Sequence, residues 1–64
     1  MDREKLLQRI IINPKIMTGK PIIKGTRLSV QYILNLLAND YTVDEILKEY
    51  EGLTKDGINA CLVY

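Results

Sequence analysis

The residue types on which most enzymes depend are scarce in this chain. Histidine is absent and Cys61 is the single cysteine, so neither a nucleophile–base pair nor a cluster of soft metal ligands can be assembled. Three hydroxyl residues precede helical patterns, where a hydroxyl commonly caps the first turn; they are Ser29, Thr42 and Thr54. We therefore expect no enzymatic activity, no bound metal, no cofactor and no small-molecule substrate.

The stretch from Gly19 to Gly25 is superficially similar to a glycine-rich loop that binds phosphate. Five residues separate Gly19 from Gly25, whereas the phosphate-binding motif has four. Thr26 follows Gly25 at the position where that motif requires lysine. We therefore interpret the stretch as turns that bound a short strand, and not as a nucleotide site.

The distribution of charge indicates where an acidic partner such as nucleic acid would bind. Residues 1–27 hold seven basic and two acidic residues, a net charge of +5, whereas residues 28–64 hold two basic and six acidic residues, a net charge of −4. Neutralisation of phosphates by lysine and arginine supplies most of the non-specific affinity for DNA. We expect Lys20, Lys24 and Arg27 to make such contacts; the alternative is that both halves are simply solvated.

Three helices with the same kind of start are predicted in the second half. Ser29, Thr42 and Thr54 would cap helices that end near Asn39, near Tyr50 and at the end of the chain. Each helix carries apolar residues at helical spacing on one face. An apolar residue precedes each cap, and a second apolar residue follows five positions after the first. This is the spacing of a hydrophobic staple. The pairs are Leu28 with Ile33, Tyr41 with Ile46, and Leu53 with Ile58.

The second and third helices are joined by a short turn that contains Gly52. Two short helices around such a turn are typical of helix-turn-helix proteins, although ordinary helical hairpins use the same turn. In a helix-turn-helix protein the third helix would be the recognition helix, and Lys55 and Asn59 would reach phosphates or base edges. Gly57 lies inside this helix, and we interpret it as a tolerated weakness rather than as a mark of close packing.

The first half is predicted to be a short helical turn followed by a β-arm that needs cover. Two runs of isoleucine, residues 10–12 and 22–23, suggest a hairpin-like pair. Consecutive isoleucines place apolar side chains on both faces of a strand, and an isolated hairpin is marginal in water. We expect a homodimer whose interface consists of Ile10, Ile11, Ile12, Ile22 and Ile23. The alternative is that Leu6 and Leu7 fold back and cover the strands within one chain.

A longer motif links the arm to the helices. Residues 13–30 have the sequence N-P-K-I-M-T-G-K-P-I-I-K-G-T-R-L-S-V. This segment resembles the signature of the family catalogued as domain of unknown function 433, approximately N-P-x-I-x-x-G-x-P-x-I-x-G-T-R-x-x-V, and the resemblance extends over residues 10–62. The chain departs from the family after the first core helix, where Asp40 stands in place of the usual glycine. We expect Asn39 to take the left-handed turn conformation there.

The resemblance implies a fold and a function. The expected fold is mainly α, with a three-helix helix-turn-helix core of the winged-helix or homeodomain-like kind and a short N-terminal β-hairpin or β-arm. The expected function is that of an antitoxin that binds a PIN-like nuclease toxin and, in addition, its own promoter DNA. The alternatives are a protein-binding or dimerisation module with no significant DNA binding, and a stand-alone dimer with a structural role.

Arg27 has two interpretations because it lies at the hinge between the arm and the helices. It could contact a phosphate or the carboxylate of a partner. It could instead pair with Asp44 or Glu49 and fasten the arm to the core, which is the interpretation we favour.

Length bounds the organisation of the chain. A protein of 64 residues is one domain, here divided into an arm (residues 1–27) and a helical core (residues 28–64). Such a domain buries only about 60% of the surface that its unfolded chain exposes, so a dimer would help to stabilise it. No segment has the apolar length of a membrane span, and the charged start is unlike a signal peptide. The lone Cys61, expected to be a small core residue, suits a reducing cytoplasm.

Overall fold

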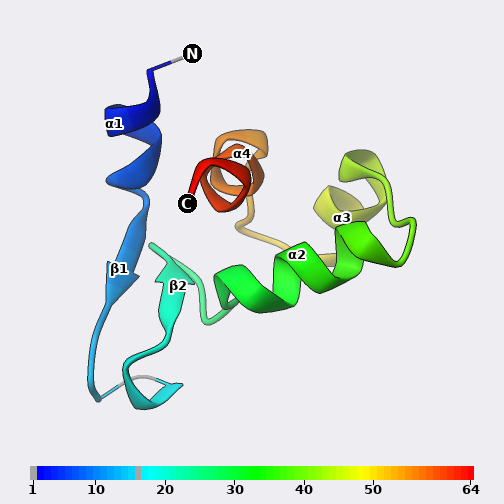
Figure 1. Ribbon diagram of the computed structural model, residues 1–64. Helices are drawn as coiled ribbons and strands as arrows, with labels where there is room; N and C mark the ends of the chain where they lie inside the picture. Colours follow the sequence, from blue (N-terminus) through cyan, green and yellow to red (C-terminus); the bar gives the residue numbers. More distant parts are fainter. Residues whose placement is uncertain (1, 16) are drawn as a thin grey trace.

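Short helices and one hairpin make up the fold of this chain (Figure 1). The computed structural model describes residues 2–15 and 17–64. In chain order the elements are α1 (Arg3–Leu7), β1 (Ile10–Ile12), the 3-10 turn η1 (Met17–Gly19), β2 (Pro21–Ile23), α2 (Val30–Ala38), α3 (Val43–Glu49) and α4 (Lys55–Val63). The described chain is therefore mainly helical with a two-stranded antiparallel hairpin near its N-terminus, as the sequence predicts.

The predicted starts of the three core helices are confirmed. The Ser29 hydroxyl accepts a hydrogen bond from the Tyr32 amide at 3.0 Å, and the Thr54 hydroxyl accepts one from the Gly57 amide at 3.1 Å. Thr42 forms a complete capping box, in which its hydroxyl and a glutamate side chain each accept a backbone amide. Each cap satisfies backbone donors that the first turn cannot pair, and its loss typically costs about 1 kcal/mol.

The end of α2 differs from the prediction by one residue. Asp40 has the positive φ, at +67°, whereas Asn39 has a φ of −97°. The Tyr41 amide donates to the Leu36 carbonyl at 3.1 Å and the Asp40 amide donates to the Leu37 carbonyl at 3.2 Å. This pair of hydrogen bonds is a Schellman motif, which places the left-handed residue one position after the helix cap. The expectation that Asn39 would take this conformation is therefore wrong.

One isoleucine from each core helix lies at the centre of the core. Ile33, Ile46 and Ile58 are all 0% exposed, and they are the C-terminal members of the three predicted staple pairs. The rest of the buried cluster consists of Ile23, Val30, Leu53 and Cys61. Burial of an isoleucine side chain contributes about 1.5–3 kcal/mol, so this cluster holds α2, α3, α4 and β2 together.

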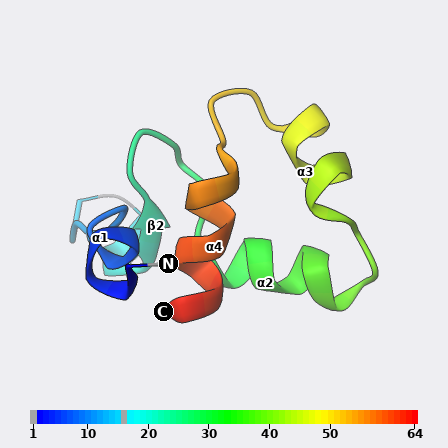
Figure 2. The same cartoon turned by 90° about the horizontal axis from the view of Figure 1, so that it is seen from above.

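Helix α1 packs against α4, which makes α4 the central helix of the fold (Figures 1 and 2). Leu6 is 7% exposed, and the Arg3 guanidinium donates to the Val63 carbonyl at 3.3 Å. Asp2 caps α1 by accepting the Glu4 amide at 3.0 Å. The N-terminal residues therefore fold back onto their own chain, but they dock mainly on α4, whereas the alternative to the dimer expected Leu6 and Leu7 to cover the strands.

Gly57 marks a close approach between α4 and β2, which corrects our interpretation of it as a tolerated weakness. A Cβ atom at this position would lie 3.3 Å from Ile23 Cγ2 and 3.3 Å from Leu53 Cδ1. The residue is buried. Glycine therefore lets β2 lie closer to the helix than alanine would allow.

The hairpin covers more of its own apolar surface than the dimer prediction assumed. The register pairs Ile10 with Ile23 and Ile11 with Ile22. Ile22 is 1% exposed and Ile23 is 3% exposed within a single chain, so the expectation that these two would form a dimer interface is wrong. Ile10 and Ile11 are half-buried. Ile12 is 59% exposed, because it lies where the strand runs beyond the core.

Candidate functional site

Helix α3 and its flanking turns form an acidic lobe, which we define as residues 40–51. It contains five carboxylates and one lysine, a net charge of −4; the carboxylates are Asp40, Asp44, Glu45, Glu49 and Glu51, and all five residues are exposed. The helix exposes Asp44, Glu45 and Glu49 because the opposite face of α3 is anchored by Ile46, which is fully buried. The lobe would repel the phosphates of nucleic acid and attract a basic surface.

The capping box holds one carboxylate of the acidic lobe in place. The Thr42 amide donates to Glu45 Oε1 at 3.0 Å, and the Glu45 amide donates to Thr42 Oγ1 at 3.1 Å. The hydrogen bond from the Thr42 amide is the main reason that the pKa of Glu45 is lowered, with a further contribution from the Thr42 hydroxyl. The capping box therefore favours the charged form of Glu45.

Aromatic side chains lie within the acidic lobe and beside it. Tyr32 of α2 and Tyr50 at the end of α3 meet edge to face, with ring centroids 5.9 Å apart and an interplanar angle of 89°. Their hydroxyls hydrogen-bond to each other, which raises the pKa of Tyr50 to about 12. Tyr32 is 42% exposed, and Tyr41 in the preceding turn is 41% exposed. Large, partly exposed rings of this kind are favoured at protein interfaces, where they also attract arginine and lysine.

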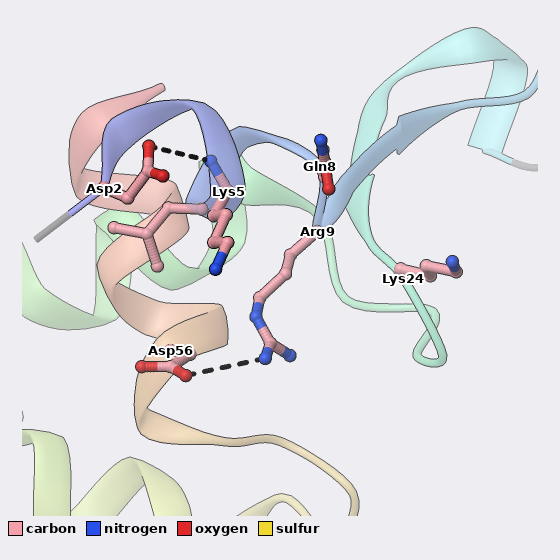
Figure 3. A pocket seen from close by; sticks show the side chains of 7 residues that line it. Asp2, Lys5, Gln8, Arg9, Lys24 and Asp56 are labelled. Carbon is pink, nitrogen blue, oxygen red and sulfur yellow. Dashed lines mark hydrogen bonds and ion pairs between the residues drawn. The ribbon is translucent and has the colours of Figure 1, made fainter.

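Basic side chains gather at the other end of the molecule, around a hollow of about 570 Å³ between α1, the hairpin and the first turn of α4. We call this the basic hollow; its charged and polar lining residues are Asp2, Lys5, Gln8, Arg9, Lys24 and Asp56. In Figure 3, Lys5 and Arg9 point into the space above Asp56, whereas Lys24 extends away from them. Three cations and two carboxylates give the lining a small excess of positive charge.

The ion pair in the basic hollow is weak. Arg9 Nη2 lies 3.5 Å from Asp56 Oδ2, and the two side chains are 47% and 60% exposed. Exposed pairs of this geometry contribute about 0–1 kcal/mol, because water screens them. Asp56 therefore holds the Arg9 side chain only weakly.

The predicted DNA contacts of the arm do not form one cluster. Lys24 follows β2 and lines the basic hollow. Lys20 precedes β2 and lines a separate apolar hollow of about 350 Å³ beside α2 and Tyr64. Arg27 is exposed in the turn before α2. Within residues 2–15 and 17–64 it forms no ion pair, so the favoured pairing with Asp44 or Glu49 is wrong.

The predicted contacts of the third core helix lie on a narrow strip. Lys55 is exposed and Asn59, one turn later, is half-buried; Leu62 continues the strip and is 60% exposed. The other faces of α4 pack against α1, α2, α3 and the hairpin. A helix that is covered on so many sides can present only this strip to a DNA groove.

Lys5 and Arg9 belong to the basic hollow but were not among the predicted site residues. They lie far from Lys24 in sequence, and the hairpin places the backbones of Arg9 and Lys24 side by side. The Lys24 amide donates to the Arg9 carbonyl at 2.7 Å, so these two residues are direct cross-strand neighbours. The strand register was the missing information: once Ile10 is paired with Ile23, Arg9 must lie opposite Lys24.

The acidic lobe and the basic hollow lie at opposite ends of the molecule. Figure 1 shows α3 at one end and α1 with the hairpin at the other, and the Cα positions extend over 30 Å in the longest direction. The Debye length at physiological ionic strength is about 8 Å. Each end can therefore attract its own partner with little interference from the other.

Across residues 2–15 and 17–64 no three His, Cys, Asp or Glu side chains converge as a metal site would need. Cys61 is 2% exposed, and burial raises the pKa of its thiol to about 11, so it packs as a small apolar residue. No helix in this part of the chain is long and apolar enough to cross a membrane.

The chain is thus a small, mainly helical protein with an acidic region at one end and an excess of basic residues at the other. Comparison with known proteins then gives the family. Residues 10–64 match the family described as protein of unknown function (DUF433), and the chain belongs to this family. It is also 50% identical over 24 residues to an uncharacterized protein of Archaeoglobus fulgidus, an alignment that covers 38% of this chain and 67% of that protein. No solved structure matches the chain.

Proposed function

We propose that this protein is a non-enzymatic, dimeric antitoxin with two binding surfaces: the acidic lobe binds a basic protein partner, a PIN-like nuclease toxin, and the basic hollow binds the phosphates of promoter DNA. The observation that carries the proposal is the separation of opposite charge to the two ends of a molecule only 30 Å long. A protein that bound DNA alone would gain nothing from a lobe with a net charge of −4.

The acidic lobe suits a nuclease partner for an electrostatic reason. A nuclease that acts on RNA must attract phosphates, so the surroundings of its active site are basic. Carboxylates such as Asp44 and Glu49 would compete for the same basic residues. Tyr32 and Tyr41 supply large contact area with few rotatable bonds, so they lose little conformational entropy on binding.

Support for the DNA-binding surface comes from the basic hollow and from the helix-turn-helix arrangement that we propose for α3 and α4. The two helices are joined by a turn in which Gly52 has a φ of +86°. Lys55 and Asn59 lie on the exposed strip of α4, and the hollow begins at the first turn of the same helix, at Asp56. Lys5, Arg9 and Lys24 would then contact phosphates beside the groove that Lys55 and Asn59 enter.

The test separates the two surfaces by charge reversal. Lys5→Glu with Lys24→Glu alters the basic hollow, and Lys15→Glu with Lys48→Glu is the matched control that changes net charge equally elsewhere. Binding to random-sequence duplex DNA is measured over a range of salt concentrations. We expect the hollow variant to reduce the slope of log K against log salt by about 2, and the control to change it less. Equal effects of the two variants would contradict a specific role of the hollow.

The acidic lobe is tested with Glu49→Lys and Glu51→Lys, which lie at the end of α3 where positive charge does not disturb the helix dipole. The chain is expressed together with the product of the adjacent reading frame. Co-purification and inhibition of nuclease activity should be lost in this variant and retained in the hollow variant. A partner that binds both variants equally would remove the acidic lobe from the proposal.

A second candidate function, a protein-binding module without DNA affinity, is favoured by one observation. Helix α4 is covered by α1, α2, α3 and the hairpin, which leaves only a strip for base contacts. A chain that binds its protein partner but shows no DNA binding at low ionic strength would establish this alternative.

A further inference from the structure

Strand β1 has one paired edge and one free edge. Within residues 2–15 and 17–64 it pairs only with β2. Figure 1 shows β1 on the outside of the hairpin, with no other segment beyond it. Its three residues are all isoleucine, so the strand has none of the charges or prolines that usually protect an edge from pairing with another chain.

The hydrogen bonds of the hairpin show which peptide groups face the free edge. The Lys24 amide donates to the Arg9 carbonyl, so Arg9 and Lys24 form a hydrogen-bonded pair of the ladder. Such pairs alternate along an antiparallel ladder, and the next one is Ile11 with Ile22. The amides and carbonyls of Ile10 and Ile12 must therefore point outward from β1.

The outer edge of β2 offers no such opening. The Ile23 amide points outward on that side and donates to the Leu28 carbonyl at 2.9 Å. Ile22 forms a bridge with Ser29 on the same side. Pro21 has no amide hydrogen to donate. Strand addition to this hairpin is therefore restricted to β1.

We propose that β1 pairs in antiparallel orientation with β1 of a second copy of this chain, with Ile11 on the two-fold axis. This inference rests on the dimeric part of the proposed function and requires neither DNA nor toxin. In this register Ile10 faces the partner's Ile12, and Ile12 faces the partner's Ile10. All four outward peptide groups of each strand are then paired, whereas Ile10 opposite itself, or Ile12 opposite itself, would pair only half of them.

The flanking residues and side chains suit the same register. Gln8 is the cap of α1 and Pro14 lacks an amide hydrogen, so the ladder ends on both sides of the isoleucines. Ile12, 59% exposed in the single chain, would pack beside the partner's Ile10. Arg9 would lie opposite the partner's Asn13, so no like charges oppose each other. The isoleucine strand is therefore complementary to itself.

Single-cysteine variants test the register directly. In the proposed register Ile11 faces Ile11 of the second copy as a non-hydrogen-bonded pair, in which the two Cα atoms lie about 4.5 Å apart. A disulfide spans Cα distances of about 4.4–6.8 Å. Ile11→Cys should therefore form a covalent dimer on mild oxidation. Ile10→Cys and Ile12→Cys should not, because each would be offset from its counterpart by two residues. The unchanged chain, in which Cys61 is buried, is the control.

Sedimentation equilibrium tests the association without a covalent bond. Ile12→Lys adds a charge to the free edge, and Leu62→Lys is a matched control because Leu62 is 60% exposed and Ile12 is 59% exposed. We expect Ile12→Lys to weaken self-association by about tenfold or more, and Leu62→Lys to leave it unchanged. A wild-type chain that stays monomeric up to about 1 mM, equal effects of the two lysines, or cross-linking at position 10 or 12 instead of 11 would overturn the proposal.

Discussion

Replacement of Leu6 by alanine should release α1 from the protein without unfolding the rest. A five-residue helix has no stability of its own in water, so its structure depends on docking. Leu6 is 7% exposed and is the only fully buried residue of α1. The polar contacts that remain, from Arg3 to the Val63 carbonyl and from Arg9 to Asp56, are exposed and contribute little.

The magnitude follows from the buried carbon atoms. Leu6→Ala removes three carbons at about 0.8 kcal/mol each, or about 2.4 kcal/mol in total. A helix at the surface can move away instead of leaving a cavity, so the additional cost seen in closed cores does not apply. At about 1.4 kcal/mol per tenfold change, docking should weaken by about fifty-fold.

Amide hydrogen exchange measured by NMR reports each part separately. The Leu6 amide donates to Asp2 and is the reporter for α1. The Ile33, Ile46 and Ile58 amides donate to the three cap carbonyls and are the reporters for the core helices. Protection should fall by about fifty-fold at Leu6 and stay nearly constant at the other three. Under the proposed function, DNA affinity should fall as well, because Lys5 would leave the basic hollow.

Two results would refute this reasoning. An equal loss of protection in α1 and in α2–α4 would show that the whole chain unfolds as one cooperative unit. Unchanged protection of α1 would show that Leu6 does not hold it. Leu7→Ala serves as the control, because Leu7 is only half-buried and its truncation should have the smaller effect.

Three further predictions concern single side chains. Folding lowers the pKa of Glu45, so the charged carboxylate stabilises the protein above the unfolded pKa, and this contribution is lost as the pH falls through the folded pKa. Urea denaturation should therefore show that Glu45→Gln loses less stability than the unchanged chain between neutral pH and the acid range below 4.5. Tyr32→Phe removes the hydroxyl that raises the pKa of Tyr50 to about 12, so an ultraviolet titration should show the Tyr50 pKa moving back toward 10. Cys61 should react with a thiol reagent at neutral pH only after denaturation, and fast reaction of the native chain would contradict its burial.

Local features of the fold were predictable because their causes lie within a few residues. Ser29, Thr42 and Thr54 start helices through hydrogen bonds to amides three residues later. The central core positions follow from the spacing of apolar residues after these caps. The misplaced left-handed residue, Asp40 instead of Asn39, shows the limit of this approach, since side-chain preference alone does not fix the position of a Schellman motif.

Features that depend on distant residues were predicted less well. Docking of α1 onto α4 joins residues near the two ends of the chain, and no local pattern distinguishes it from docking onto a partner. The same uncertainty led to the wrong assignment of Ile22 and Ile23 to a dimer interface. The basic hollow was missed for the same reason, because Arg9 and Lys24 become neighbours only through the hairpin register. Conversely, the charge imbalance between the two halves could be counted directly from the sequence.

The one-sided hairpin also bears on aggregation. A sheet with two open edges can add strands at both and grow into a filament. Here Pro21 and the hydrogen bond from Ile23 to Leu28 close one side permanently. Pairing at the other side would use up the last open edge, so growth must stop at a four-stranded sheet. An isoleucine strand whose Ile12 is 59% exposed would thereby be protected from amyloid-like polymerisation by the topology of its own hairpin.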